Sequence, residues 1–328
     1  MKLMLDIKIG KPEQRIDYRD KMLVCGSCFT EHIGSRLHDL KFAVLQNPNG
    51  IIFDPFTVAT SITSYIDHKF FLEGDLVHLN ELWQSWQHHS RFSGINKDEV
   101  LAAINESQEA AHHYLKDAKW LIITLGTSFS YRLVDGMKPV ANCHRAPANW
   151  FQKQLMTIEE IQASLDTMLY KLFLFNKNIH VIFTVSPVRH IRDGLIENNR
   201  SKARLIESVH HLVGKYDRLF YFPSYELVID VLRDYRFYDI DLVHPNYQAT
   251  EYVLQQFMEH FINNESNTIS KEIDKINIAR KHRAFQPDTE AYKNFLKLQA
   301  ERTRELLKTY PFIDLQEELD YFEGSSEC

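Results

Sequence analysis

The chain has few of the features that are typical of disulfide-stabilised, disordered or membrane-spanning proteins. Only four of its 328 residues are cysteines, at Cys25, Cys28, Cys143 and Cys328, too few for a disulfide scaffold of this length. Reduced thiols are therefore expected. Glycine (11) and proline (10) are also scarce, which argues against long disordered linkers. No apolar run approaches the ~18 residues of a transmembrane helix, and the first residues lack the apolar core of a signal peptide. We expect a cytoplasmic protein.

An excess of positive charge is also missing. Lysine and arginine number 38 against 44 aspartates and glutamates, which gives a net charge of −6. This balance argues against binding to nucleic acid, and nothing in the sequence indicates a membrane partner. Hydrophobic residues make up 44% of the chain, which is ample for a large core.

Short apolar runs alternate with longer stretches of helical period. Strands are predicted at 21–24, 42–45, 120–125, 180–185 and 219–222. Helices are predicted at 28–40, 57–67, 97–117, 157–176, 199–216, from near Ser224, and at 247–262. Residues 80–94 are rich in aromatic residues and histidine and show no clear period. Continuous apolar strands separated by helices predict an α/β fold, a three-layer α/β/α sandwich around a mostly parallel sheet.

The sequence pattern changes near residue 264. We expect a main domain over residues 1–264 and a helical extension over 265–328, joined by the polar segment 263–270. The extension is expected to dock on the main domain or on a second copy, which would make a homo-oligomer through these helices. A partly solvated tail is the alternative.

The first candidate for chemistry is Ser27, which lies directly after a predicted buried strand and directly before a helix. Ligands bind at this end of the strands in a parallel sheet. The first N–H groups of the helix would lie close to a developing oxyanion. Gly26 allows the tight turn that this requires. The alternative is that Ser27 only caps the helix.

The second candidate is the segment from Asp241 to Asn246, which lies in the last loop before the last helix of the domain. A carboxylate three residues before a histidine can accept the Nδ1 proton and leave Nε2 free as a base. Because the chain has 16 histidines, a single histidine would carry little weight. The presence of Asp241 three residues before it makes His244 a candidate general base.

Together these segments resemble a known family. Cys25-Gly26-Ser27-Cys28-Phe29 matches the signature from which GSCFA-domain proteins take their name, with Thr30 in place of the final alanine. The similarity spans roughly residues 1–262 and continues through 47–50, 89–94, 125–127, 186–190, 199–202 and the D-x-x-H of Asp241 and His244. The GSCFA family is grouped with the SGNH/GDSL hydrolases. The resemblance implies a flavodoxin-like sheet and cofactor-free ester hydrolysis or acyl transfer, commonly on O-acylated, carbohydrate-like small molecules.

Carried over residue by residue, the resemblance makes Ser27 the nucleophile, His244 the general base and Asp241 its orienting partner. The oxyanion donors would be the N–H groups of Ser27 and Gly50, with an asparagine as the third. That asparagine is absent, because its place reads Gly126-Thr127-Ser128. Thr127 or Ser128 would have to supply the third donor, or the side chain of Asn47 or Asn49 would have to reach the oxyanion. One lost donor costs about two to three decades in rate.

Three further side chains in predicted loops are candidates for substrate contacts: His89, Arg189 and His190. Arg189 and His190 follow a predicted strand, so they are expected to face the same cleft and to contact a carboxylate, phosphate or sugar hydroxyl. Surface or salt-bridge roles are the alternative for each.

Other classes of function remain open. Cys25 and Cys28 form a C-x-x-C at a helix start, as in thioredoxin-type redox sites, where the helix N-terminus would lower the pKa of Cys25. A zinc site from Cys25, Cys28, Cys143 and His144 has suitable ligand types but lacks the usual loop between the second pair. A non-catalytic binding module is a third alternative. Replacement of Ser27 by alanine separates them, since it abolishes only ester hydrolysis.

Overall fold

The central sheet has five parallel strands in a doubly wound order. The computed structural model describes residues 4–324. The strands are β1 (Met22–Gly26), β2 (Val44–Gln46), β5 (Trp120–Leu125), β9 (His180–Val185) and β10 (Leu219–Tyr221). Their order is β10-β9-β5-β1-β2, and every neighbouring pair is parallel. This is the flavodoxin-like order, and it confirms the expected fold class.

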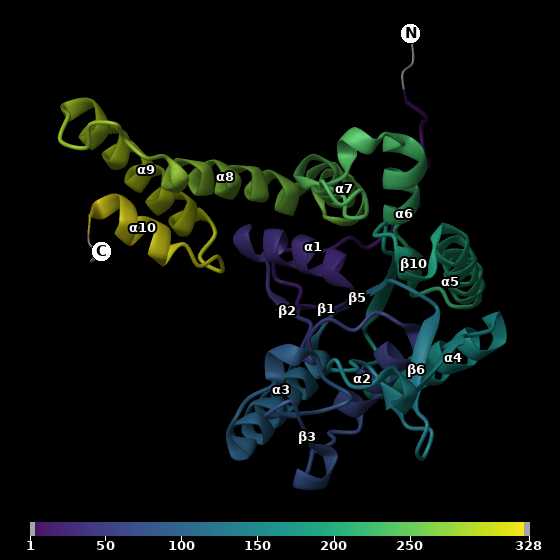
Figure 1. Cartoon of the computed structure of the whole chain (residues 1–328). Coiled ribbons are helices and arrows are strands. Elements are labelled where there is room, and N and C mark those ends of the chain that lie inside the picture. The colour runs from purple at the N-terminus through teal and green to yellow at the C-terminus, as the bar shows by residue number, and fades with distance from the viewer. Residues whose placement is uncertain (1–3, 325–328) are drawn as a thin grey trace.

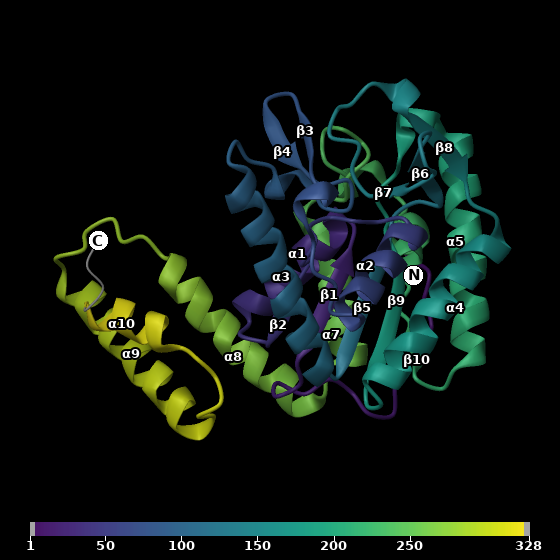
Figure 2. The same ribbon diagram turned by 90° about the horizontal axis from the view of Figure 1, so that it is seen from below.

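Helices cover both faces of the sheet, as Figures 1 and 2 show. One face carries α1 (Cys28–Asp39) and α7 (Tyr247–Phe261). The other carries α2 (Pro55–Ile66), α3 (Lys97–Asp117), α4 (Ile158–Phe175) and α5 (Leu195–Lys215). Alternate residues of β1 point to the two sides, so Met22 and Val24 join one core and Leu23 and Cys25 the other. The result is the predicted three-layer sandwich.

Two small antiparallel sheets extend the domain beyond the main sheet. One is the hairpin of β3 (Val77–Leu79) and β4 (Leu82–Gln84). The other has the order β7-β6-β8, from β6 (Phe129–Leu133), β7 (Pro139–Val140) and β8 (Phe151–Leu155). Figure 2 shows both at the same end of the domain. The sequence pattern did not predict these strands, because runs of two to five residues carry too little periodicity to read.

The predicted boundaries hold for the most buried elements and shift elsewhere. The helix at 97–117 and the strands at 120–125 and 180–185 have the predicted limits. The helix expected from Ser224 is only one α-helical turn, α6 (Ser224–Glu226), followed by a π-helical turn at Leu227–Leu232. It ends at Arg233, whose φ of 44° is left-handed. Short 3₁₀ turns lie at Glu73–Asp75, Ser90–Phe92, Ala148–Trp150, Ile191–Asp193 and Tyr235–Phe237.

The polar segment 263–270, predicted as the joint between domain and extension, forms the start of a helix. Helix α8 (Asn264–Lys281) starts there because the Asn263 side chain accepts a hydrogen bond from the Ser266 N–H at 2.7 Å. The Ser266 hydroxyl in turn accepts from the Tyr18 N–H at 3.0 Å and ties the helix start to the domain. Polar residues that cap a helix look like a loop in sequence.

Helices α8, α9 (Glu290–Thr309) and α10 (Gln316–Glu323) form an arm beside the domain (Figures 1 and 2). Its buried side chains belong to the same apolar core as the α1 and α7 face of the sheet. The Glu318 carboxylate is buried and pairs with Lys41 at 3.0 Å and with Arg280 at 3.0 Å. The arm is thus packed on the domain rather than a solvated tail. In the described part of the chain, no helix combines the length and apolarity needed to cross a membrane.

Candidate active site

The hydroxyl of Ser27 lies at the carboxyl end of β1 and has no structural partner. Gly26 turns the chain with a φ of +144°, and a Cβ there would lie 2.3 Å from the Thr124 carbonyl oxygen, so only glycine fits. Ser27 holds the N-cap position of α1, yet its side chain makes no capping bond. Its Oγ is buried and has no hydrogen-bond partner among residues 4–324. The alternative of a simple cap therefore loses its basis.

Asp241 and His244 are in direct contact. The Nδ1 of His244 lies 2.6 Å from Oδ2 of Asp241. The other carboxylate oxygen accepts the main-chain N–H groups of Val243 at 2.9 Å and His244 at 3.0 Å. The His244 N–H, the His244 ring and the Val243 N–H together lower the pKa of Asp241 to about 2. An ionised Asp241 fixes the ring with Nδ1 protonated, which leaves Nε2 as the basic nitrogen.

The loop that carries this pair lies beside the end of β9. The Arg189 N–H donates to the carbonyl of Val243, the residue before His244, at 3.4 Å. His190 lies close enough to His244 for a charge on His244 to contribute to the lowered pKa of His190. The structure joins Asp241 to His244 directly, whereas the Ser27 hydroxyl makes no hydrogen bond with His244.

The two predicted main-chain oxyanion donors have internal acceptors. Gly50 has a φ of +81°, and a Cβ there would lie 2.1 Å from Cβ of His89. Its N–H donates to the Asn47 carbonyl at 2.7 Å. The Ser27 N–H donates to the Thr124 carbonyl at 3.2 Å, a long hydrogen bond.

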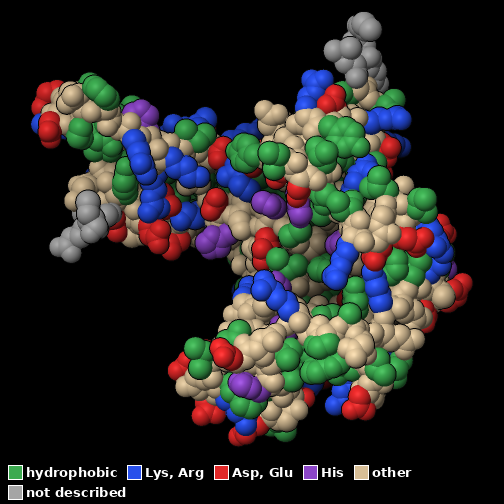
Figure 3. All heavy atoms as spheres, in the orientation of Figure 1, with side chains coloured by type: hydrophobic (Ala, Val, Ile, Leu, Met, Phe, Trp, Pro, Cys, Tyr) green, Lys and Arg blue, Asp and Glu red, His purple; other side chains and the backbone are tan. Residues whose placement is uncertain are grey.

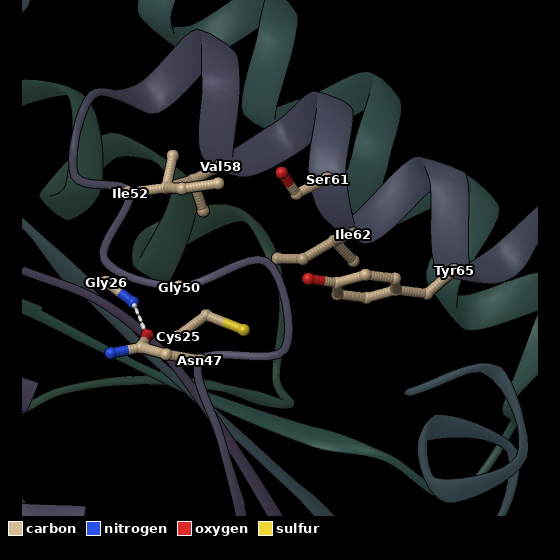
Figure 4. Close-up of a pocket in the computed structure, with 9 residues that line it drawn as sticks. All are labelled: Cys25, Gly26, Asn47, Gly50, Ile52, Val58, Ser61, Ile62 and Tyr65. Atoms are coloured by element: carbon tan, nitrogen blue, oxygen red, sulfur yellow. Dashed lines mark hydrogen bonds between the residues drawn. The ribbon is translucent and has the colours of Figure 1, made fainter. Parts of the chain in front are cut away.

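Asn47 provides a side-chain donor that is not in use. Its Oδ1 accepts the Gly26 N–H at 2.9 Å, which attaches the amide to the residue before Ser27 (Figure 4). Its Nδ2 is buried without a partner in the described chain. Figure 4 shows this nitrogen directed away from Ser61 and Tyr65, which line the other side of a cavity of about 10 Å³. A cavity of that size holds at most one water molecule.

The other proposed substitutes for the missing asparagine are already bonded. Asn49 donates from Nδ2 to the Ser61 hydroxyl at 3.2 Å. The Thr127 hydroxyl lies 2.9 Å from that of Ser201, and the Ser128 N–H donates to the same Ser201 oxygen at 2.7 Å. Thr127 and Ser128 thus anchor the chain after β5 to helix α5. Of the four substitutes, Asn47 alone has a side-chain donor atom with no hydrogen-bond partner among residues 4–324.

The predicted substrate-contact residues differ in their surroundings. His89 accepts the Arg91 N–H on Nδ1 at 3.3 Å, and burial lowers its pKa. Burial lowers the pKa of His190 to about 4, so this ring is neutral near pH 7. The His190 N–H is held by the Asn198 side chain at 2.9 Å. Arg189 is half-buried.

Sequence reasoning missed Lys202, a fully buried lysine on helix α5. Its Nζ donates to the carbonyls of Gly126 and Ser186, each at 2.6 Å, and so links the ends of β5 and β9. Burial lowers its pKa to about 7. A signal was present: Lys202 lies at helical spacing with the buried Leu205 and Val209, on the apolar side of α5.

Comparison with models of protein families shows to which family the chain belongs. Residues 21–257 match the GSCFA family, and residues 273–325 match the C-terminal domain of GSCFA domain proteins. The chain belongs to the GSCFA family. No curated protein matches it. One similar solved structure is an acetyl xylan esterase, Est2A, from the rumen bacterium Butyrivibrio proteoclasticus, with 12% identity and a TM-score of 0.36. The match covers 74% of this chain and 64% of that one, less than two thirds of its length.

Of the two signature cysteines of this GSCFA protein, Cys25 is buried and Cys28 is partly buried. Burial raises the pKa of Cys25 well above its ordinary value, and burial also raises that of Cys28. The expectation that the helix N-terminus lowers the pKa of Cys25 is therefore wrong, because desolvation is the larger effect. Cys25, Cys28 and Cys143 are free, while Cys328 lies outside the described residues. Within 4–324, no group of three or more potential ligands is arranged to hold a metal ion, which removes the zinc alternative.

Proposed function

We propose that this GSCFA protein is a serine ester hydrolase with Ser27 as nucleophile, His244 as general base and Asp241 as its orienting partner. The observation that carries the proposal is the 2.6 Å contact between His244 Nδ1 and Asp241 Oδ2, since it leaves Nε2 basic. The uncommitted hydroxyl of Ser27 supports it as well. Both segments belong to the carboxyl edge of the parallel sheet, where such folds bind their ligands.

The first half of the reaction forms an acyl-enzyme. Ser27 Oγ attacks the ester carbonyl carbon while its proton passes to Nε2 of His244. Collapse of the tetrahedral intermediate breaks the bond to the alcohol oxygen, and His244 returns the proton to that oxygen. Asp241 remains ionised and stabilises the imidazolium.

The second half restores the enzyme. Water attacks the acyl carbon and gives its proton to His244. The bond to Ser27 Oγ then breaks and Ser27 regains a proton, so ester and water become acid and alcohol. Nδ2 of Asn47 is the proposed third oxyanion donor, because its amide is attached to Gly26 and its N–H groups lack an acceptor.

Hydrolysis of 4-nitrophenyl acetate at about pH 8 tests the proposal. The wild type should turn over this ester, and Ser27→Ala and His244→Ala should each lose most of the rate. Thr30→Val is a matched control. The Thr30 hydroxyl is buried one turn further along α1 and has no partner among residues 4–324, so its removal breaks no hydrogen bond described there.

Covalent labelling provides a second readout that does not depend on turnover. Diethyl 4-nitrophenyl phosphate should phosphorylate Ser27 and release 4-nitrophenol, and peptide mass spectrometry locates the adduct. Hydrolysis that survives Ser27→Ala, or a wild type that neither hydrolyses the ester nor takes the label, would contradict the proposal.

A further inference from the structure

Arg189 lies at the proposed catalytic edge. It follows β9 by four residues, and its N–H contacts the carbonyl of Val243 in the loop that carries His244. Figure 3 shows a hollow in the middle of the molecule, with basic, histidine and acidic side chains around it. The guanidinium of Arg189 lies 6.0 Å from the ring centre of Tyr238.

The guanidinium of Arg189 has no acceptor in the described chain. No carboxylate between residues 4 and 324 comes within ion-pair distance of it, and its Nε is buried without a hydrogen bond. Arg36 is also partly buried, but its guanidinium donates two hydrogen bonds to the carboxylate of Glu251. A buried donor left unpaired is costly, so an acceptor from a ligand would stabilise the site.

A second basic side chain without a carboxylate partner in the described chain lies on the same edge. Lys202 is buried, and its two acceptors are the neutral carbonyls of Gly126 and Ser186. The neighbouring charges that act on it come from Cys28 and Arg189, and none is a carboxylate. Cys28 adjoins Ser27, so the Lys202 amine lies near the segment that carries the proposed nucleophile.

Two carboxylates near this edge are committed to other partners. Asp241 holds His244, and Glu226 accepts the Tyr221 hydroxyl on both oxygens. Glu31, in the first turn of α1, lies near Cys28 and His89. Arg189 itself keeps a positive charge with no carboxylate partner in the described chain. Such a local field attracts an anion from solution.

We propose that Arg189 binds a carboxylate carried by the ester substrate, so that this enzyme selects anionic over neutral esters. This inference rests on the proposed ester hydrolysis and specifies its substrate class. The planar fork of a guanidinium pairs with a carboxylate through two parallel hydrogen bonds, which fixes the orientation of the ester as well as its charge.

Two pairs of esters test the charge and its position. Phenyl acetate and 3-acetoxybenzoate differ by a carboxylate on the leaving alcohol, and 4-nitrophenyl acetate and mono-4-nitrophenyl glutarate differ by a carboxylate on the acyl group. In one pair, the wild type should prefer the anionic ester by roughly tenfold or more in kcat/KM. The pair that shows the preference reveals which part of the substrate carries the anion.

Arg189→Gln should remove that preference through a higher KM for the anionic ester, so that the ratio of kcat/KM between the anionic and the neutral ester falls by roughly tenfold. Arg189→Lys should keep part of it, because the charge remains without the fork. Arg192→Gln is the matched control, since Arg192 is exposed three residues further along the same loop. Equal use of anionic and neutral esters by the wild type, or a preference that survives Arg189→Gln, overturns the inference.

Binding separates this inference from the hydrolase proposal. Calorimetric titration of Ser27→Ala with 3-acetoxybenzoate and with monophenyl glutarate measures the anion site without turnover. One of them should bind Ser27→Ala at least tenfold more tightly than the double variant Ser27→Ala, Arg189→Gln. If the wild type hydrolyses no ester but this difference is seen, hydrolysis fails and the anion site stands. If both ligands bind the two variants equally, the anion site fails.

Discussion

The imidazole of His244 is hydrogen-bonded to the carboxylate of Asp241, and both residues belong to one segment of four residues. Asp241 accepts the ring Nδ1 and the main-chain N–H of the same histidine. The ring and the backbone that carries it are thus fixed by one side chain, although both residues are half exposed. The orientation of the base depends on local hydrogen bonds rather than on surrounding packing.

Asp241→Asn is expected to reduce kcat/KM for 4-nitrophenyl acetate by roughly 10²–10⁴, because the amide no longer holds the ring with Nδ1 protonated. The melting temperature should change little, since the site is exposed and asparagine retains an oxygen for the two N–H groups. Stopped assays and thermal melts of both proteins measure the two effects. A variant with wild-type kcat/KM would show that Asp241 does not orient the base.

Asn47→Asp tests the proposed third oxyanion donor. The new side chain keeps an oxygen for the Gly26 N–H and lacks the Nδ2 donor. Loss of one such donor costs about 10²–10³ in kcat, with a smaller effect on KM. Steady-state kinetics measure this, and circular dichroism checks that the variant is folded. A folded variant that retains full kcat would exclude Asn47 from the oxyanion hole.

Lys202→Met should alter how stability depends on pH. Burial lowers the pKa of Lys202 from its ordinary 10.5 to about 7. Between these values the unfolded chain holds more protons at this position than the folded one, so wild-type stability rises with pH relative to the variant. Below about pH 7 both states are protonated and the difference should level off. Urea unfolding of both proteins across this range measures it, and a difference that stays constant with pH would be the contrary result.

The signature cysteines should be unreactive in the folded protein. Because burial raises the pKa of Cys25 and Cys28, iodoacetamide should modify them slowly until the chain is unfolded in guanidinium. Mass spectrometry of native and unfolded samples measures the difference. Cys28→Ala should retain ester hydrolysis, whereas a redox role predicts rapid alkylation and loss of activity.

Glu318→Ala should loosen the C-terminal arm. Glu318 is buried between Lys41 and Arg280, which are partly exposed and can regain water when the carboxylate is removed. We expect a loss of about 1–3 kcal/mol in the free energy of unfolding, below the cost for a fully buried pair. Urea unfolding measures this loss, and Glu301→Ala at an exposed position of α9 serves as the control. Equal stability of the two variants would show that this ion pair does not hold the arm.

The sequence was most informative where burial is complete. β5 and β9 lie in the centre of the sheet, and their uninterrupted apolar residues predicted both with correct limits. The strands β6 and β8 pair in an antiparallel sheet that no single segment encodes, since each mixes polar and apolar residues. Long-range pairing of this kind is specified by tertiary contacts.

In the candidate site, too, local contacts could be predicted from the sequence and long-range contacts could not. The contact between Asp241 and His244 is local and followed from their spacing. The link from Lys202 to Gly126 joins residues far apart in sequence and needed the assembled sheet to appear. The commitment of Thr127 and Ser128 to Ser201 was likewise invisible, because their hydroxyls have many possible partners in an unfolded chain.

The buried hydroxyl of Ser27 has a consequence for inhibitor kinetics. A reagent can reach Oγ only after the surrounding atoms move, so labelling requires an opening step followed by bond formation. As the concentration of reagent increases, the labelling rate should reach a plateau equal to the opening rate. Beyond that point, reagents of very different intrinsic reactivity would inactivate the protein equally fast.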